Sequence, residues 1–152
     1  RYKNNFSIAV AESCTGGMLS SYLTSIDGSS TFFEGSIVSY SNFLKCKLLK
    51  VSGKTIKKYG AVSDQTALEM VMGLEKICKS EIFISITGVA GPGGGSKKAP
   101  VGCVFFGMGI KTGKKYEYST EKKIFGNYSR LQIQKKSTEF ALKKIIKLIK
   151  KI

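Results

Sequence analysis

The chain has 152 residues and a net charge of +15, because 25 Lys and Arg stand against only 10 Asp and Glu. This length is typical of one domain with one hydrophobic core, which we expect over residues 1–152. No apolar stretch approaches the roughly 20 residues of a transmembrane helix, and nothing resembles a secretory leader, so we expect a cytoplasmic protein without a membrane partner.

The chain contains no histidine. This excludes Ser-His-Asp and Cys-His catalysis and imidazole-ligated zinc. The Asp and Glu residues are scattered singly and the four cysteines form no CxxC pair, so we expect no metal, no cofactor and four reduced thiols. Any hydrolytic chemistry would have to use a lysine, a tyrosine, a carboxylate or the backbone.

Lysine supplies 23 of the 25 basic residues, and the two arginines are Arg1 and Arg130. Guanidinium groups are the side chains that read guanine and phosphate bidentately. The basic balance therefore favours general attraction of anions over a base-reading surface, and we expect no nucleic-acid partner.

Apolar runs of strand length alternate with segments of helical periodicity. The predicted strands cover residues 6–11, 32–40, 81–87, 101–110 and 116–124. The predicted helices cover residues 17–24, 42–49, 53–59, 64–79 and 128–152. Strands that alternate with helices early and pair through a hairpin late, at residues 112–114, predict an α/β fold with a mixed sheet and helices on both faces.

Several polar residues and glycines are expected to delimit these helices. Thr15, Ser41, Ser52 and Ser63 are the candidate N-caps. Gly60 is expected to supply a left-handed position at a helix end, and residues 27–30 a turn. The last helix carries an apolar stripe opposite a lysine face, which favours packing on the core over a membrane-surface or nucleic-acid helix. That stripe consists of Ala141, Leu142, Ile145, Ile149 and Ile152.

The first strand runs directly into the motif Ala11-Glu12-Ser13-Cys14-Thr15-Gly16-Gly17. An apolar strand that ends in hydroxyls, a thiol and a helix start is where open α/β sheets place their chemistry. The helix start offers free N–H groups to an anion, and the glycines let it approach the backbone. Ser13, Cys14 and Thr15 are all candidate nucleophiles, and a capped tight turn without chemistry is the alternative.

A second motif, Tyr40-Ser41-Asn42-Phe43-Leu44-Lys45, follows the second strand. If a helix begins at Ser41, Lys45 projects from its first turn toward the edge of the sheet that carries Ser13. A lysine with a pKa lowered by desolvation can act as a base for a serine hydroxyl, and Tyr40 could relay the proton. The alternative is a capped helix with a solvated lysine.

A glycine-rich loop, residues 88–95, follows the buried third strand and leads to Lys97 and Lys98. Its backbone N–H groups can form an anion nest. It is not a Walker A loop, because no Gly-Lys-Ser/Thr follows at the required spacing. It is not a dinucleotide-binding GxGxxG turn that opens a helix either, because a predicted strand comes next. A phosphate-binding loop and a simple surface loop both remain open.

Together these motifs resemble the CinA C-terminal domain family, whose stand-alone members are nicotinamide-mononucleotide (NMN) amidohydrolases. The similarity runs from about Phe6 to the end of the chain in compatible order and spacing. Besides the three motifs above, the matching segments are Gly28-Ser29-Ser30 with Phe33, Leu48-Leu49 with Val51, Gly60-Ala61-Val62-Ser63 and Pro100-Val101-Gly102.

The resemblance implies an α/β/α sandwich with a mostly parallel sheet, a homo-oligomer, and metal-free hydrolysis of the NMN carboxamide to nicotinate mononucleotide and ammonia. It also implies roles for particular residues. Ser13 would be the nucleophile, Lys45 with Tyr40 its activating group, and Thr15 with the N–H groups of Gly16 and Gly17 the oxyanion donors. The other substrate-binding residues would be Asn42, Gly88, Gly91, Gly93, Gly94 and Arg130.

One departure from the family concerns the last helix. Members usually carry an arginine two residues after the glycine of its opening motif, whereas here Gly126 and Asn127 are followed by Tyr128. Arg130 would then have to reach the substrate from half a turn away. A non-catalytic nucleotide- or nucleic-acid-binding module of the same fold is therefore the alternative function.

Overall fold

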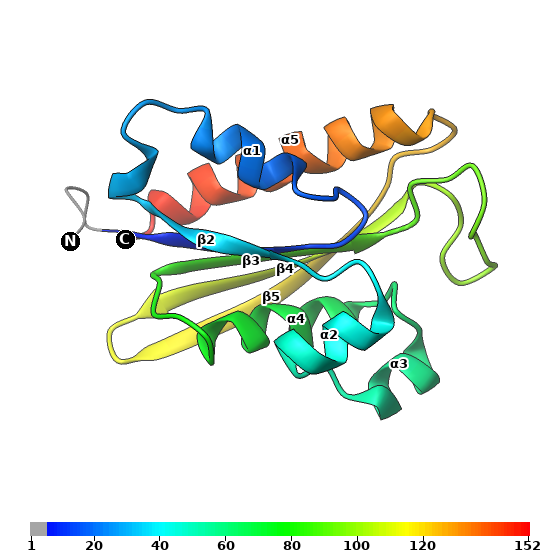
Figure 1. Ribbon diagram of the computed structural model, residues 1–152, viewed down its shortest axis with the longest axis horizontal. Helices are drawn as coiled ribbons and strands as arrows, with labels where there is room; N and C mark the ends of the chain where they lie inside the picture. The colour runs from blue at the N-terminus through cyan, green and yellow to red at the C-terminus, as the bar shows by residue number, and fades with distance from the viewer. Residues whose placement is uncertain (1–5) are drawn as a thin grey trace.

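The computed structural model describes residues 6–152 as a five-stranded sheet between two layers of helices (Figure 1). The strands are β1 (Ile8–Glu12), β2 (Phe33–Val38), β3 (Ile82–Gly88), β4 (Cys103–Thr112) and β5 (Lys115–Ile124). The helices are α1 (Met18–Thr24), α2 (Asn42–Leu49), α3 (Gly53–Tyr59), α4 (Asp64–Glu75) and α5 (Arg130–Ile149), with a 3-10 helix η1 (Ser29–Thr31). The predicted α/β/α sandwich is confirmed.

The sheet has the strand order β2-β1-β3-β4-β5. Strand β1 runs parallel to β2 and β3, and β4 runs antiparallel to β3 and β5. Every strand but β4 therefore points the same way, as expected of a mixed, mostly parallel sheet. Because the chain leaves β1 for β2 on one side and later places β3 on the other, the carboxyl end of β1 is a topological switch point, where such sheets bind ligands.

The alternation of side chains along the central strands builds a core on each face of the sheet. On one face, Ile8 and Val10 of β1 pack with Leu19 of α1 and with Ile133 and Ile145 of α5. On the opposite face, buried side chains of β1, β3, α2 and α4 meet; they are Ala9, Ala11, Phe83, Leu49, Met70, Val71 and Leu74. Helices α1 and α5 thus cover one side, and α2, α3 and α4 the other (Figure 1).

The helix starts follow their polar caps. The hydroxyls of Ser41, Ser52 and Ser63 accept backbone N–H groups at the starts of α2, α3 and α4, as predicted. Helix α5 begins later than predicted, at Arg130, because Ser129 and Gln132 form a capping box. The predicted turn at residues 27–30 leads through Gly28 into η1.

Other boundary predictions were wrong. Helix α4 ends at Glu75 rather than at residue 79, since Lys76 is already its C-cap. Gly60 has a positive φ of 90° but an extended ψ of 162°, so it is not in the left-handed helical conformation. In α5 the predicted stripe packs on the core through Ala141 and Ile145, whereas Ile152 is exposed.

Candidate active site

The polar motifs meet at the carboxyl ends of the parallel strands. Ser13 follows β1, Tyr40 follows β2, and the loop of residues 89–102, which contains nearly all of the glycine-rich loop, follows β3. Because β4 is antiparallel, this loop begins and ends at the same edge of the sheet. The first turn of α5 also lies there, beside the loop (Figure 1).

Ser13 and Lys45 form a buried pair, as the sequence predicted from the two strand ends. Lys45 Nζ lies 2.8 Å from Ser13 Oγ, although 32 positions separate the residues. The side chains are nearly enclosed, with Ser13 7% and Lys45 2% exposed. Lys45 Nζ also donates to the Ser39 carbonyl oxygen at 2.7 Å. A neutral amine that donates to this carbonyl has its lone pair left to accept the proton of the Ser13 hydroxyl.

Burial determines the protonation of this lysine. Desolvation lowers the pKa of Lys45 to about 8, and no carboxylate among residues 6–152 is paired with it; nearby Cys14 and Cys46 oppose the shift only in part. With a pKa of about 8, roughly a tenth of the molecules carries the basic, uncharged amine at pH 7, and about half of them do at pH 8. Lys45 therefore has both the position and the protonation of a general base for Ser13.

Glu12 organises the turn that carries Ser13. Its carboxylate is fully buried and accepts the N–H groups of Gly17, Leu19 and Ser20 at the start of α1. It also accepts the hydroxyls of Thr15 and Ser20. An anion at a helix N-terminus is stabilised by the unpaired N–H groups and by the helix dipole.

These contacts correct two expectations for the first motif. Thr15 is not the N-cap of α1: that position is Gly17, which has no side chain to accept a hydrogen bond from the helix. The expected oxyanion donors are already engaged, because the Thr15 hydroxyl and the Gly17 N–H donate to Glu12 and the Gly16 N–H donates to the Ser13 carbonyl.

Two other amides of the turn are available instead. Among the described residues, the N–H of Thr15 has no acceptor, and that of Cys14 contacts only its own thiol. The N–H of the residue after the nucleophile is a common oxyanion donor in strand-turn-helix sites. Cys14 and Thr15 thus offer backbone donors beside Ser13 Oγ.

The Cys14 thiol is poorly suited to be the nucleophile. Burial raises the pKa of Cys14 to about 12, so the thiol is neutral at physiological pH, and the thiolate is the reactive form. The side chain is 4% exposed. Of the three candidate nucleophiles, Thr15 uses its hydroxyl to donate a hydrogen bond to Glu12, and Cys14 is a neutral thiol. Ser13 is the candidate with a base beside it.

A pocket of about 320 Å³ opens over this pair, a size typical of sites for small molecules. It brings together most of the residues predicted to bind substrate. Those that line it are Ser13, Tyr40, Asn42, Lys45, Gly88, Gly91, Gly93, Gly94 and Arg130. Thr15, Gly16 and Gly17 do not line it.

The glycine-rich loop presents unpaired amides to the pocket. The N–H groups of Gly91, Gly93 and Gly94 donate to no acceptor among the described residues. Gly91 and Gly94 have positive φ values of 80°, and no atom lies within 4 Å of where a Cβ on Gly93 would stand. Consecutive free N–H groups on an uncovered backbone form a concave site for an anion.

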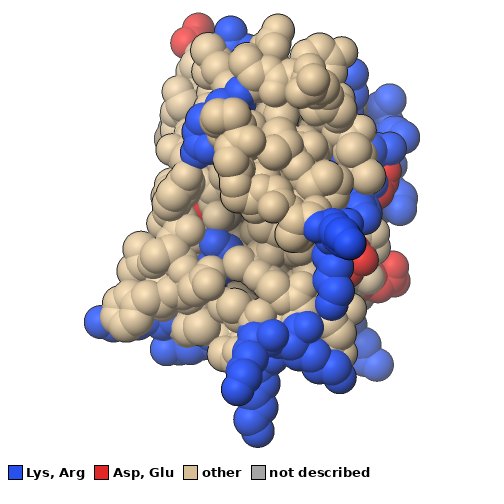
Figure 2. Space-filling model, turned by 90° about the vertical axis from the view of Figure 1, so that its right-hand side faces the viewer, with Lys and Arg blue, Asp and Glu red and all other residues tan. Residues whose placement is uncertain are grey.

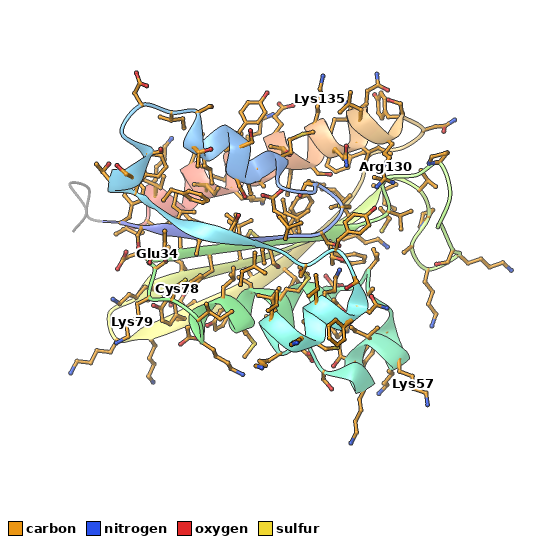
Figure 3. The ribbon with its side chains drawn as sticks, in the orientation of Figure 1. Glu34, Lys57, Cys78, Lys79, Arg130 and Lys135 are labelled. Atoms are coloured by element: carbon orange, nitrogen blue, oxygen red, sulfur yellow. The ribbon has the colours of Figure 1, made fainter. Side chains whose placement is uncertain are left out.

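Arg130 reaches the pocket from the first turn of α5 (Figure 3). Its guanidinium donates to the Gly91 carbonyl at 2.9 Å and to the Tyr40 hydroxyl at 2.6 Å. The Tyr40 hydroxyl is therefore hydrogen-bonded to Arg130. Lys45 Nζ approaches Tyr40 at its backbone carbonyl oxygen instead, at 3.5 Å. Tyr128, which replaces the family arginine, does not line the pocket, and its ring lies 4.3 Å from Lys136 Nζ.

Two groups that contact the residues of the site were not predicted from the sequence: the Glu12 carboxylate and the Ser39 carbonyl oxygen. The signal for Glu12 was a carboxylate immediately before a helix start, where an anion is favourable. No sequence signal marks a backbone carbonyl. Within residues 6–152, no group of three or more His, Cys, Asp or Glu side chains could hold a metal ion, and no helix is long and apolar enough to cross a membrane.

The fold and the pocket define a class: an open α/β domain with a buried Ser–Lys pair and a glycine-rich loop with unpaired backbone N–H groups at the switch point of its sheet. The sequence model of the CinA C-terminal domain matches residues 2–149. The chain therefore belongs to the CinA C-terminal domain family.

Known relatives agree with this assignment. A CinA-like protein of Petrotoga mobilis is 45% identical over 149 residues, which are 98% of this chain and 36% of the relative. The chain thus spans about a third of the length of this relative. The crystal structure of a competence/damage-inducible protein of Agrobacterium tumefaciens has a TM-score of 0.89 at 35% identity, over 94% of this chain and 85% of that one. A CinA superfamily protein of Escherichia coli gives a TM-score of 0.87 at 31% identity, over 94% and 80%.

Proposed function

We propose that the protein hydrolyses the carboxamide of nicotinamide mononucleotide to nicotinate mononucleotide and ammonia. The observation that carries this proposal is the Ser13–Lys45 pair, with 2.8 Å between Nζ and Oγ at the bottom of a pocket lined by free backbone amides. A serine with a neutral lysine as base is a known arrangement for acyl transfer without histidine. The resemblance to amidohydrolases supplies the identity of the amide.

The chemistry follows from the geometry of the pair. Lys45 Nζ takes the proton of Ser13 as Oγ attacks the carboxamide carbon. The N–H groups of Cys14 and Thr15 stabilise the oxyanion, and one such donor typically contributes about 3 kcal/mol to lowering the barrier. The Lys45 ammonium then protonates the leaving nitrogen, and ammonia departs. Water, activated by the same amine, hydrolyses the resulting Ser13 ester and releases the carboxylate.

The phosphate of the nucleotide needs a cationic or N–H-rich contact, and the other side of the pocket supplies both. Gly91, Gly93 and Gly94 offer backbone N–H groups, and Arg130 offers the guanidinium N–H groups that Gly91 and Tyr40 leave unused. We place the phosphate there, which directs the pyridine ring toward Ser13. Arg130 would then take the place of the family arginine that Tyr128 replaces.

The identity of the products tests this proposal. Purified protein is incubated with NMN, and the mixture is separated by chromatography with mass detection. We expect nicotinate mononucleotide and an equal amount of ammonia. Free nicotinamide with ribose 5-phosphate would instead show glycosidic cleavage, and unchanged NMN would contradict the proposal.

A non-catalytic binding module is the second candidate, favoured by the net charge of +15 and by Tyr128 in place of arginine. It predicts that NMN binds without turnover, or that duplex DNA is retained with a steep dependence on salt concentration. Binding without products in the same mixtures would favour this function over hydrolysis.

A further inference from the structure

A second hollow lies on the other side of the glycine-rich loop from the candidate active site. Its volume is about 420 Å³, and its far wall is the end of α3 with the residues that follow. The two hollows share Ala61, Val62, Val89 and Gly94 as their common border. Only small or apolar residues thus separate the pocket over Ser13 from the second hollow.

Basic side chains and no carboxylate line both hollows. Lys57, Lys58 and Lys98 line the second hollow, whereas three hollows elsewhere on the molecule each include a glutamate. Figure 2 shows the end of the molecule that carries the loop and α3, where basic groups gather and acidic groups lie mostly at the margin. Figure 3 shows Lys57 at the end of α3, below the loop. An anionic ligand is the class that this lining favours.

An aromatic side chain accompanies these cations. Tyr59 lines the second hollow and is 40% exposed, although it belongs to the last turn of a helix. Lys58 Nζ lies 5.0 Å from the centre of its ring. An accessible aromatic ring beside ammonium groups is the combination by which proteins bind a nucleotide, through stacking of the base and attraction of the phosphate.

The border between the hollows suits a phosphate linkage. Gly94 lies on this border and Gly93 precedes it in the first pocket; both present backbone without side chains, and their N–H groups have no acceptor among residues 6–152. A diphosphate could lie across this stretch of backbone and continue into the second hollow. A mononucleotide needs only the first pocket, so the second hollow is surplus for NMN.

We infer that the two hollows together bind a pyridine dinucleotide, with the nicotinamide half over Ser13 and the second nucleotide between Tyr59 and Lys57, Lys58 and Lys98. This inference rests on the proposed function, because that function places the nicotinamide half in the first pocket. It enlarges the ligand class from a mononucleotide to a dinucleotide that carries the same carboxamide.

Calorimetric titration of the Ser13→Ala protein with NMN and with nicotinamide adenine dinucleotide tests the inference without turnover. We expect the dinucleotide to bind about tenfold more tightly, which corresponds to about 1.4 kcal/mol. In a background that also carries Lys57→Gln, Lys58→Gln and Lys98→Gln, the ratio of the two dissociation constants should fall toward one.

A matched triple variant controls for the loss of three positive charges. Lys114, Lys147 and Lys150 are exposed and line neither hollow, so their replacement by glutamine should leave the tenfold ratio in place. Equal affinities for NMN and the dinucleotide, or equal losses in the two triple variants, would overturn the inference while the proposed function stands. A protein that neither binds nor hydrolyses NMN would refute the proposed function, and the inference would fall with it.

Discussion

At the scale of single residues, the protonation of Lys45 controls the proposed reaction. Below its pKa of about 8, the fraction of uncharged amine falls tenfold per pH unit. We therefore expect kcat/KM for NMN to rise with pH up to about 8 and then to level off. Initial rates between pH 6.5 and 9.5 measure this. Lys47→Gln, an exposed lysine of the same helix, should keep the profile, and a profile flat from pH 6.5 to 9.5 would remove Lys45 as the base.

Glu12 is expected to act through the turn that it holds. In Glu12→Gln an amide N–H₂ would face backbone N–H donors, so we expect a loss of about 1–3 kcal/mol in the free energy of unfolding. Because the amides of Cys14 and Thr15 shift with the turn, kcat should fall at least about tenfold with little change in KM.

A second capping carboxylate provides the control for Glu12. Glu69 accepts the Ser52 N–H and the Thr55 hydroxyl at the start of α3, away from Ser13. Glu69→Gln should reduce stability, measured by urea unfolding, and leave kcat unchanged. Equal kcat values for the two variants would show that Glu12 has no specific link to the reaction.

The residues of the site were predictable where strand ends determine them. The carboxyl ends of parallel neighbours meet at one edge, so Ser13 after β1 and Lys45 shortly after β2 had to lie close. The Thr15 cap was wrong because the buried Glu12 carboxylate is the stronger acceptor and takes the N–H groups of α1. The direction of the Tyr40 ring depends on Arg130, 90 positions away, and local sequence carries no such information.

At the scale of elements, the position of α2 against α4 determines where Lys45 lies. Gly73 of α4 packs directly beneath the end of α2: a Cβ there would stand 2.1 Å from the Leu49 carbonyl oxygen. Gly73→Ala must therefore push α2 outward. We expect a loss of about 1–3 kcal/mol in the free energy of unfolding and a fall in kcat, because Lys45 moves away from Ser13.

Another helical glycine supplies the comparison for Gly73. No atom lies within 4 Å of where a Cβ on Gly53 of α3 would stand, so Gly53→Ala should be tolerated without loss of stability or activity. Thermal unfolding and rates of both variants measure the difference. Equal behaviour would show that the close approach of α4 to Leu49 does not position α2.

Helix starts were more predictable than helix ends. A serine hydroxyl that accepts an N–H two or three residues later is a local event, and Ser41, Ser52 and Ser63 all behave as expected. The end of α4 is not local. Ile77 is apolar and fits the helical period, yet it lies beyond the end of the helix and is 52% exposed. The helical periodicity predicted that Ile77 would be buried in the core, but the helix ends before it and the side chain is exposed.

At the scale of the whole molecule, self-repulsion should lower stability. The net charge is +15, and ion pairs of the described chain include those of Glu81, Glu121 and Glu139, none of which is buried. Screening should relieve more repulsion than it costs in such pairs, because pairs at the surface contribute little to stability. We expect the Tm to rise when the NaCl concentration is raised from about 20 mM to about 500 mM. A falling Tm in calorimetry would contradict this.

The layers of the molecule were predictable, but the order of the strands was not. Alternating strands and helices implied helices on both faces, and the Thr112-Gly113-Lys114 turn implied the β4–β5 hairpin. That β3 pairs with β1 rather than with β2 depends on contacts across 70 positions and more. The second hollow beside the active-site pocket follows from that assembly and from no single motif.

Ser13, activated by Lys45, is the proposed nucleophile for amide hydrolysis in a protein without histidine. The most direct measurement compares initial rates of ammonia release from NMN at pH 8 for the wild type, Ser13→Ala and Ser21→Ala, the last an exposed serine of α1. We expect Ser13→Ala to lose activity by about 10³-fold or more and Ser21→Ala to match the wild type. Turnover by Ser13→Ala at the wild-type rate would contradict the account.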